Sequence, residues 1–178
     1  MNDKKLIFRN NLVELEPADI NNVDLLIQWT LDPIANGPYK KVTDLNEVEL
    51  KRLFLSNKKR HYFLIKKAGN GQPLGRFYYR AWKFREEKDK IDWELNIMIA
   101  YPTERGKGYG TATQKLIIDH LLRLKGTNSI FAYTSIDNIA EQKVLEKIGF
   151  SKVGLLPVDY YKVKSSLKCI LYSIKNVK

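Results

Sequence analysis

Apolar side chains recur along the chain at two spacings, every second residue in some stretches and every third or fourth residue in others. The first spacing predicts strands and the second predicts helices. Strands are expected over residues 5–16, 61–67, 74–84, 91–100, 128–135, 150–157 and 167–174. Helices are expected from Asp19 to about Trp29, from Asp44 to Leu55, from the glycines near residue 108 to about Lys125, and from Asp137 or Asn138 to Gly149. This alternation predicts a single α/β domain with a mixed sheet over residues 1–178.

The strand expected over residues 91–100 has two chemically different faces. Its odd positions are apolar, from Ile91 to Ile99, whereas Asp92 and Glu94 stand at even positions. Successive side chains of a strand point to opposite faces, so one face packs against a core and the other carries both carboxylates. These carboxylates are either the solvent side of a half-covered strand or a functional pair.

The charge balance makes the chain basic. The 178 residues include 31 Lys and Arg against 20 Asp and Glu, which gives a formal net charge of +11, and both halves of the chain share the excess. Such a charge attracts polyanions or a phosphate-rich cofactor. No helix-turn-helix, zinc finger or aromatic-basic RNA motif accompanies it, so we expect no nucleic-acid partner.

The cysteine and histidine content excludes two classes of small scaffold. Cys169 is the only cysteine, and the two histidines, His61 and His120, lie far apart in the sequence. Neither a disulfide framework nor a zinc site is therefore expected, and we expect no bound metal. Arg9 breaks the apolar run at the N-terminus, and no window of about 20 apolar residues follows. We expect a cytoplasmic protein with no membrane partner.

A glycine-rich loop, residues 105–110, lies between an expected strand and an expected helix. Glycine lets the backbone approach a ligand closely, and a helix N-terminus presents unpaired N–H groups to phosphate oxygens. The loop has neither the spacing of a Walker A motif nor the acidic partner of a dinucleotide fingerprint. It is either a tight strand-to-helix turn or an anion-binding loop.

Two blocks of residues resemble the GCN5-related N-acetyltransferase (GNAT) superfamily, in the branch that includes ribosomal-protein alanine acetyltransferases. The first block is Arg105-x-x-Gly108-x-Gly110, after a strand that ends Met98-Ile99-Ala100-x-Pro102. The second block, farther downstream, is Asn138-x-Ala140 followed by Leu145-Glu146-Lys147-x-Gly149-Phe150. This resemblance implies a mixed, mostly antiparallel sheet of about seven strands flanked by helices. Acyl-CoA would bind at a splay between the strands after residues 91 and 128.

The resemblance also assigns residues to acetyl-CoA, the implied co-substrate. Backbone groups of Met98, Ile99 and Ala100 would pair with the pantetheine arm like an added strand, and Asn138 would bond to the same arm. Backbone N–H groups of the glycine loop would hold the pyrophosphate, with added charge from Arg105 and Lys107. The residues that supply these N–H groups are Arg105, Gly106, Lys107, Gly108, Tyr109, Gly110 and Thr111.

Glu94 is the candidate general base, and Asp92 is the second candidate. An alkylamine is almost wholly protonated at pH 7, so acetyl transfer to an amine needs a group that removes the proton. Glu94 matches the position of the glutamate base in histone-acetylating members of the superfamily, and Asp92 matches the position used in another branch. The acceptor would be a primary amine on a small molecule or a peptide N-terminus. We expect a monomer or homodimer.

Two positions depart from the family pattern. Leu145 stands where many members have a tyrosine that protonates the departing thiolate, and Glu141 stands where the related branch usually has serine. Tyr133, Tyr160 and Tyr161 are candidates to replace the missing acid. Three functions therefore stay open: an acetyl-CoA-dependent N-acetyltransferase, a CoA-binding sensor without turnover, and a basic RNA- or ribosome-binding module.

Overall fold

The computed structural model describes residues 8–39, 42–57, 59–82, 89–156 and 168–176. These residues form eight strands: β1 (Phe8–Arg9), β2 (Val13–Pro17), β3 (Arg60–Lys67), β4 (Pro73–Trp82), β5 (Ile91–Ile99), β6 (Thr127–Ser135), β7 (Ser151–Leu155) and β8 (Cys169–Lys175). They also form five α-helices and a short 3₁₀ helix: α1 (Val23–Leu31), α2 (Pro33–Asn36), α3 (Glu47–Ser56), α4 (Tyr109–Leu121), α5 (Ile139–Lys147) and η1 (Pro102–Glu104).

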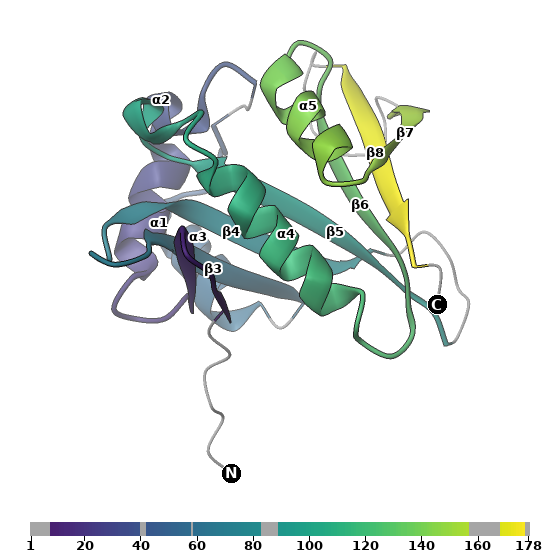
Figure 1. The fold of residues 1–178 in the computed structure, drawn as a ribbon. Helices are drawn as coiled ribbons and strands as arrows, with labels where there is room; N and C mark the ends of the chain where they lie inside the picture. The colour runs from purple at the N-terminus through teal and green to yellow at the C-terminus, as the bar shows by residue number, and fades with distance from the viewer. Residues whose placement is uncertain (1–7, 40–41, 58, 83–88, 157–167, 177–178) are drawn as a thin grey trace.

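The strands build one open sheet in the order β1-β2-β3-β4-β5-β6-β8-β7 (Figure 1). Neighbouring strands are antiparallel except β5 and β6, which run parallel. The mixed, mostly antiparallel sheet with flanking helices is therefore confirmed, with one strand more than expected. β5 and β6 pair only from Ile91 with Thr127 to Glu94 with Phe131, and beyond these residues they diverge. The expected splay between the two strands is present.

Helices cover both faces of the sheet (Figure 1). α4 and α5 lie on one face, over a core that includes Phe77, Leu95 and Ile130. α1, α2 and α3 lie on the other face, over a second core that includes Leu64 and Met98. The sheet is thus the middle layer of three, and β5 lies near its centre.

The single strand expected over residues 5–16 is wrong, because a turn at Asn10 divides its described part into β1 and β2. The side-chain oxygen of Asn10 accepts hydrogen bonds from the backbone N–H groups of Leu12 and Val13, each at 2.9 Å. Asparagine forms such local turns readily, because its side chain replaces a backbone partner. This turn accounts for the eighth strand.

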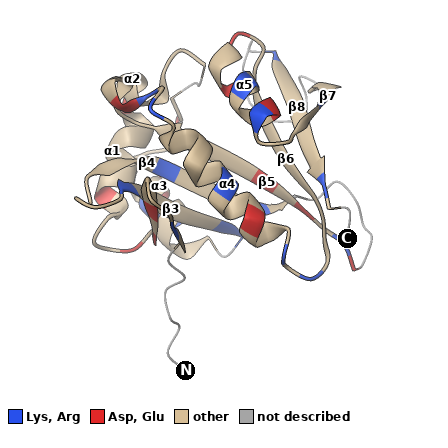
Figure 2. Ribbon diagram, viewed as in Figure 1, with Lys and Arg blue, Asp and Glu red and all other residues tan. Residues whose placement is uncertain are grey.

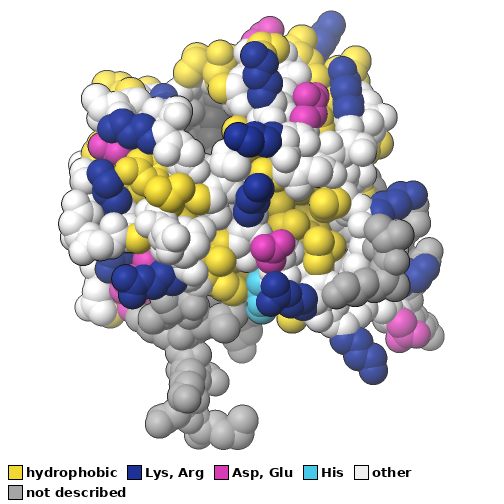
Figure 3. Space-filling model, in the orientation of Figure 1, with side chains coloured by type: hydrophobic (Ala, Val, Ile, Leu, Met, Phe, Trp, Pro, Cys, Tyr) yellow, Lys and Arg dark blue, Asp and Glu magenta, His cyan; other side chains and the backbone are white. Residues whose placement is uncertain are grey.

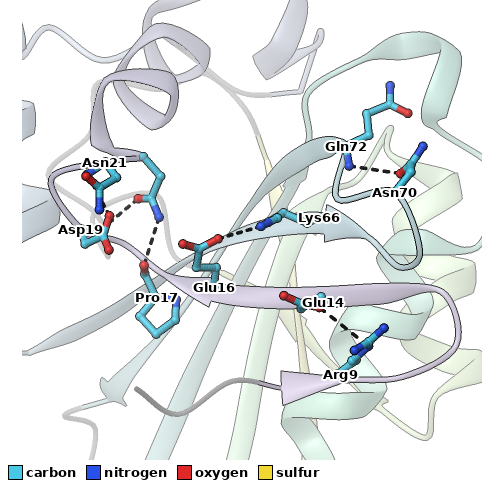
Figure 4. A network of polar contacts seen from close by, with 10 residues as sticks. Arg9, Glu14, Glu16, Pro17, Asp19, Asn21, Lys66, Asn70 and Gln72 are labelled. Carbon is cyan, nitrogen blue, oxygen red and sulfur yellow. Dashed lines mark hydrogen bonds and ion pairs between the residues drawn. The ribbon is translucent and has the colours of Figure 1, made fainter. Parts of the chain in front are cut away.

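One ion pair lies within this N-terminal hairpin and another links it to β3 (Figure 4). Arg9 Nε lies 3.7 Å from Glu14 Oε2 across the hairpin, and Lys66 Nζ lies 2.9 Å from Glu16 Oε2 between β3 and β2. Partly exposed pairs of this kind contribute about 1 kcal/mol or less. The position of the hairpin therefore depends mainly on apolar side chains such as Leu15, which is fully buried.

The start of α3 differs from the expected position. Asn46, not Asp44, caps the helix: its side chain accepts a hydrogen bond from Glu49 N at 3.0 Å, and Glu49 Oε2 accepts one from Asn46 N at 2.9 Å. This capping box satisfies two backbone donors at once, which explains why it sets the helix start. By contrast, α1 ends at Leu31, next to the predicted stop at Asp32.

The carboxylates of β5 are buried rather than exposed. Asp92 is 6% exposed and Glu94 is 0% exposed, so the interpretation of this face as the solvent side of the strand is wrong. The alternation of apolar and polar residues predicts two faces, and the second face is a buried polar layer. Buried carboxylates are stable only with hydrogen-bond or ionic partners, so each of these groups requires one.

Basic side chains are distributed over strands, helices and loops rather than confined to one element (Figure 2). No helix in the described part of the chain combines the length and the apolar character that crossing a bilayer requires. Across the same part of the chain, no three or more His, Cys, Asp and Glu side chains are grouped so as to hold a metal ion.

Candidate functional site

A cavity of about 630 Å³ opens where β5 and β6 diverge. Its walls come from both strands, the segment after α2, the glycine loop, α4 and α5. The space-filling view in the same orientation shows the surface hollowed between α2 and α5 (Figure 3). A cavity of this size is typical of sites that bind cofactors and small molecules.

The glycine loop leads into a run of unpaired backbone donors. Nothing within the described residues accepts a hydrogen bond from the N–H groups of residues 106–111, and the first bond of α4 runs from Ala112 N to Gly108 O at 2.9 Å. Gly106 and Gly108 have φ angles of 75° and 86°, a conformation that favours glycine. The positive end of the dipole of α4 lies at the same place. This arrangement has the chemistry of an anion-binding loop.

The glycines of the loop border open space. A Cβ atom at Gly106 would have no heavy atom within 4 Å, and one at Gly108 would contact only Leu12 Cδ1 at 4.0 Å. A side chain at either position would therefore occupy room that an anion needs rather than clash with packed protein. The N–H donors and the open space together fit the pyrophosphate of a CoA molecule.

Arg105 has a structural role that the sequence did not predict. Its Nε donates to Ile99 O at 3.0 Å, and its Nη2 donates to the carbonyl oxygens of Ile34 and Ala35 at 2.9 and 3.0 Å. Its backbone N–H donates to Pro102 O at 3.2 Å. Arg105 thus ties α2 to the end of β5, and the run of N–H groups open to an anion begins one residue later.

One edge of β5 is open along the cavity. Met98 and Ile99 line the cavity, and no residue of β5 beyond Glu94 pairs with β6. Ala100 differs, because its N–H donates to Leu74 O at 2.8 Å. An extended ligand can therefore add to the edge at Met98 and Ile99 as a strand would.

Asn138 caps the N-terminus of α5 and lines the cavity. Its Oδ1 accepts a hydrogen bond from Glu141 N at 3.3 Å, and its Nδ2 donates to Thr134 Oγ1 at 3.0 Å. A side-chain amide has two donor hydrogens and two lone pairs on its oxygen, so half of this capacity is unused by these bonds. Asn138 can cap α5 and still bond to a ligand.

Gln114 and Glu141 join α4 to α5 at the cavity. Gln114 Nε2 donates to Glu141 Oε1 at 3.0 Å, and both side chains line the cavity. Burial raises the pKa of Glu141 to about 7, although the hydrogen bond from Gln114 opposes the rise. Sequence reasoning missed Gln114, whose only signal is its place one helical turn after Gly110.

Glu94 lies where β5 and β6 separate and has no exposed surface. Its Oε2 accepts hydrogen bonds from Arg80 Nε and Nη2 at 2.8 and 2.6 Å, and its Oε1 accepts one from the Tyr78 hydroxyl at 3.2 Å. Burial raises the pKa of Glu94, while Arg80 and Tyr78 oppose the rise. Glu94 is not among the residues that line the cavity, so a proton from a molecule there reaches it only through an intervening group.

Asp92 lies farther from the splay, in the part of β5 that pairs with β6. Its Oδ1 accepts a hydrogen bond from Asn128 Nδ2 at 2.8 Å. Like Glu94 it is buried and does not line the cavity. The two candidate bases therefore share a face of β5, and Glu94 is the one next to the divergence of the strands.

The residues considered as proton donors to the departing thiolate lie in different places. Leu145 is fully buried in the core under α5, so its position carries no acid. Tyr133 lines the cavity. Tyr160 and Tyr161 lie outside the described residues.

A family model and several solved structures match this chain. The family model described as an acetyltransferase (GNAT) domain matches residues 9–151. A GNAT-family acetyltransferase from Bacillus anthracis has a TM-score of 0.75 at 15% identity, covering 97% of this chain and 100% of that chain. RimL, a ribosomal α-N-protein acetyltransferase in complex with coenzyme A, has a TM-score of 0.73 at 16% identity, with the same coverage.

A third solved structure has the same fold with a different acceptor. It is an aminoglycoside acetyltransferase in complex with coenzyme A and kanamycin, with a TM-score of 0.72 at 16% identity, covering 92% of this chain and 94% of that chain. Comparison with curated protein sequences finds no match. At these identities the solved structures establish the fold.

Proposed function

The chain belongs to the GNAT acetyltransferase family, and on this basis we propose that it transfers the acetyl group of acetyl-CoA to a primary amine by direct attack in a ternary complex. The observation that carries the proposal is the run of unpaired N–H groups at residues 106–111, beside the cavity that the splay of β5 and β6 creates. Anion donors next to an open strand edge suit a ligand with phosphates at one end and an extended arm at the other.

In this proposal the protein holds acetyl-CoA mainly through its backbone. The N–H groups of residues 106–111 bind the pyrophosphate. Lys107, whose Nζ lies 3.2 Å from Glu104 Oε2, adds a positive charge that this ion pair partly offsets. The edge of β5 at Met98 and Ile99 pairs with the pantetheine arm, and the Asn138 amide bonds to the same arm. When bound, acetyl-CoA supplies a thioester carbonyl that an amine can attack.

Glu94 is the proposed final acceptor of the amine proton. Neither Glu94 nor Tyr78 lines the cavity, so the proton passes first to a group between the cavity and Tyr78, and then through the Tyr78 hydroxyl, which donates to Glu94 Oε1 at 3.2 Å. Burial raises the pKa of Glu94 toward the working pH, which strengthens it as a base, and the ion pair with Arg80 preserves its charge. Asp92 is the second candidate, because it lies on the same face farther from the splay.

Two further groups complete the proposed chemistry. A backbone N–H near Ile99 stabilises the developing oxyanion of the thioester carbonyl, as fixed donors do in acyl transfer. A thiol with a pKa of about 8.5 leaves as thiolate without a strong acid, and Tyr133 is the candidate that returns its proton. We further propose that residues 1–178 form one domain that works in the cytoplasm.

The test combines binding with turnover. Acetyl-CoA is expected to raise the melting temperature, and a panel of amines, amino sugars, polyamines and peptides is expected to contain at least one that releases free thiol. A thermal shift without thiol release from any amine would indicate a CoA-binding sensor. Nucleic-acid affinity that falls steeply with salt, with no shift from acetyl-CoA, would indicate an RNA-binding module instead.

CoA affinity is expected to depend on Glu141. Because burial raises its pKa to about 7, Glu141 is mostly neutral at pH 6 and mostly a carboxylate at pH 8, where it repels the phosphates of CoA. Calorimetry should show affinity that falls roughly three-fold over this range, about 0.7 kcal/mol. Glu141→Gln should bind CoA more tightly at pH 8 and lose this part of the pH dependence. The phosphates of CoA titrate equally in both proteins, so identical pH profiles would contradict the prediction.

A further inference from the structure

Among the described residues, the guanidinium of Arg76 has no hydrogen-bond or ionic partner, although it is buried. Arg76 is 4% exposed and lies in β4 between Leu64 of β3 and Met98 of β5. Its Nε has no hydrogen-bond partner, and no carboxylate of the described residues forms an ion pair with it. Burial lowers the pKa of Arg76, although the neighbouring tyrosines oppose the shift. A buried charge of this kind is costly unless a counter-ion joins it.

Arg76 belongs to a layer of arginines and tyrosines on the face of the sheet under α1, α2 and α3. Cross-strand pairing brings Arg60 opposite Arg80 and Tyr62 opposite Tyr78, and the Arg60 guanidinium carbon lies 5.2 Å from the centre of the Tyr78 ring. The groups that influence the pKa of Arg76 are the hydroxyls of Tyr62, Tyr78 and Tyr133 and the guanidinium of Arg60. This arginine–tyrosine cluster consists of Arg60, Tyr62, Arg76, Tyr78, Arg80 and Tyr133.

Among the described residues, the cluster has more positive than negative charge. Glu94 is the carboxylate that reaches it, and Arg80 already binds Glu94 Oε2 through two hydrogen bonds. Arg60 donates to the Tyr62 hydroxyl at 3.1 Å, which is a neutral partner. Arg60 and Arg76 therefore leave an excess of positive charge next to the proposed base.

The cluster adjoins the cavity. Met98, the cross-strand neighbour of Arg76, lines the cavity, and so does Tyr133, whose hydroxyl is near enough to influence the pKa of Arg76. Arg76 itself does not line the cavity, so an anionic group of a bound molecule would reach it between Met98 and Tyr133, close to the edge where the acetyl group is proposed to lie.

We propose that Arg76 binds an oxyanion of the acceptor, so that the enzyme acetylates amines that carry a carboxylate or phosphate near the reactive nitrogen. This inference rests on the proposed acetyltransferase function. A guanidinium presents a planar fork of N–H donors that matches both oxyanions, and such charge-assisted bonds are strong in a buried site. The net charge of +11 favours the approach of the same class of acceptor.

Matched pairs of amines test the proposal. β-Alanine is compared with its amide, phosphoethanolamine with ethanolamine, and glucosamine 6-phosphate with glucosamine, which also separates carboxylate from phosphate. With acetyl-CoA saturating, thiol release should give kcat/KM at least about ten-fold higher for an anionic member than for its neutral twin. Arg76→Met should abolish this preference, so that the ratio of kcat/KM for the anionic member to that for its neutral twin falls to about one. Arg52→Met, which removes an exposed arginine on α3, is the control and should change neither.

The melting temperatures of Arg76 variants show whether Arg76 binds the acceptor or only stabilises the fold. Removal of an unpaired buried charge in favour of an apolar side chain of similar length is expected to leave the melting temperature of Arg76→Met equal to or above that of the wild type. Arg76→Lys keeps the charge but loses the fork, so its preference for anionic amines should be intermediate. A lower melting temperature of Arg76→Met together with an unchanged preference would assign Arg76 a structural role and overturn the proposal.

Failure of anion recognition by Arg76 and failure of the acetyltransferase function give different results. If the wild type acetylates neutral twins as fast as anionic amines, the inference is wrong and the acetyltransferase function stands. If no amine releases thiol, the acetyltransferase function fails. Binding of an anionic amine to the CoA complex then decides whether Arg76 recognises an oxyanion. In that case β-alanine or phosphoethanolamine at millimolar concentration should still raise the melting temperature of the wild-type protein bound to CoA. The same amines should not raise the melting temperature of Arg76→Met bound to CoA. Equal shifts in both proteins would overturn it.

Discussion

Glu94→Gln is expected to lower kcat about 100-fold while the affinity for acetyl-CoA stays unchanged, because the substitution removes the proposed proton acceptor at a residue that does not itself line the cavity. Part of the loss should be recovered at high pH, where more of the amine is already neutral. The measurement is thiol release as a function of pH, alongside calorimetric binding of acetyl-CoA. Since burial raises the pKa of Glu94, wild-type activity should decline on the acidic side at a higher pH than an exposed glutamate would give.

Asp92→Asn is the matched control for Glu94→Gln. Both substitutions neutralise a buried carboxylate on the same face of β5 that accepts a hydrogen bond from a neighbouring side chain. Asp92→Asn should retain most of the activity and show no recovery at high pH. If Asp92→Asn lost activity and Glu94→Gln kept it, the base would be Asp92 instead. Equal small losses in both, without recovery at high pH, would show that neither carboxylate acts as the base.

Gly108→Val is expected to weaken acetyl-CoA binding at least ten-fold, which corresponds to about 1.4 kcal/mol. The open space beside Gly108 is the room proposed for the pyrophosphate, and a branched side chain would fill it. The φ angle of 86° adds backbone strain to the substitution. Calorimetry with acetyl-CoA and the melting temperature of the free protein measure the two effects separately.

Gly69→Val controls for the strain. Gly69 has a φ angle of 95°, and a Cβ atom there would meet nothing within 4 Å, but it lies in the turn between β3 and β4, away from the cavity. Its melting temperature should fall about as much as that of Gly108→Val, with acetyl-CoA affinity unchanged. Unchanged affinity in folded Gly108→Val would contradict the placement of the pyrophosphate at residues 106–111.

The sequence predicted the sheet well where hydrophobic alternation is strong. In β5, apolar residues at every second position locate the strand, and the stop at Asp32 locates the end of α1. It failed where a single polar side chain decides a boundary. Asn10 makes a turn inside an apparently continuous strand, and Asn46 rather than Asp44 caps α3, because each offers hydrogen bonds that alternation does not encode.

The sequence predicts the parts of the site that lie within a local motif. The spacing of the glycine loop predicted the open N–H groups, which depend on local backbone conformation. The polar layer depends on register, which local patterns do not reveal. Arg76 and Arg80 share a face because they are an even number of residues apart. Only the pairing of β4 with β5 places Arg80 opposite Glu94 and leaves Arg76 opposite Met98, without an acid.

Acetyl-CoA is proposed to bind with its pyrophosphate on the backbone of residues 106–111. Amide resonances of isotope-labelled protein, followed by NMR during titration with acetyl-CoA, test it most directly, because they report on those N–H groups themselves. Large downfield shifts are expected for the amides of Gly106, Gly108 and Gly110, with smaller shifts along β5 at Met98 and Ile99. No shift is expected at the control position Gly69. Saturable binding that leaves the amides of residues 106–111 unshifted, or no binding at all, would contradict it.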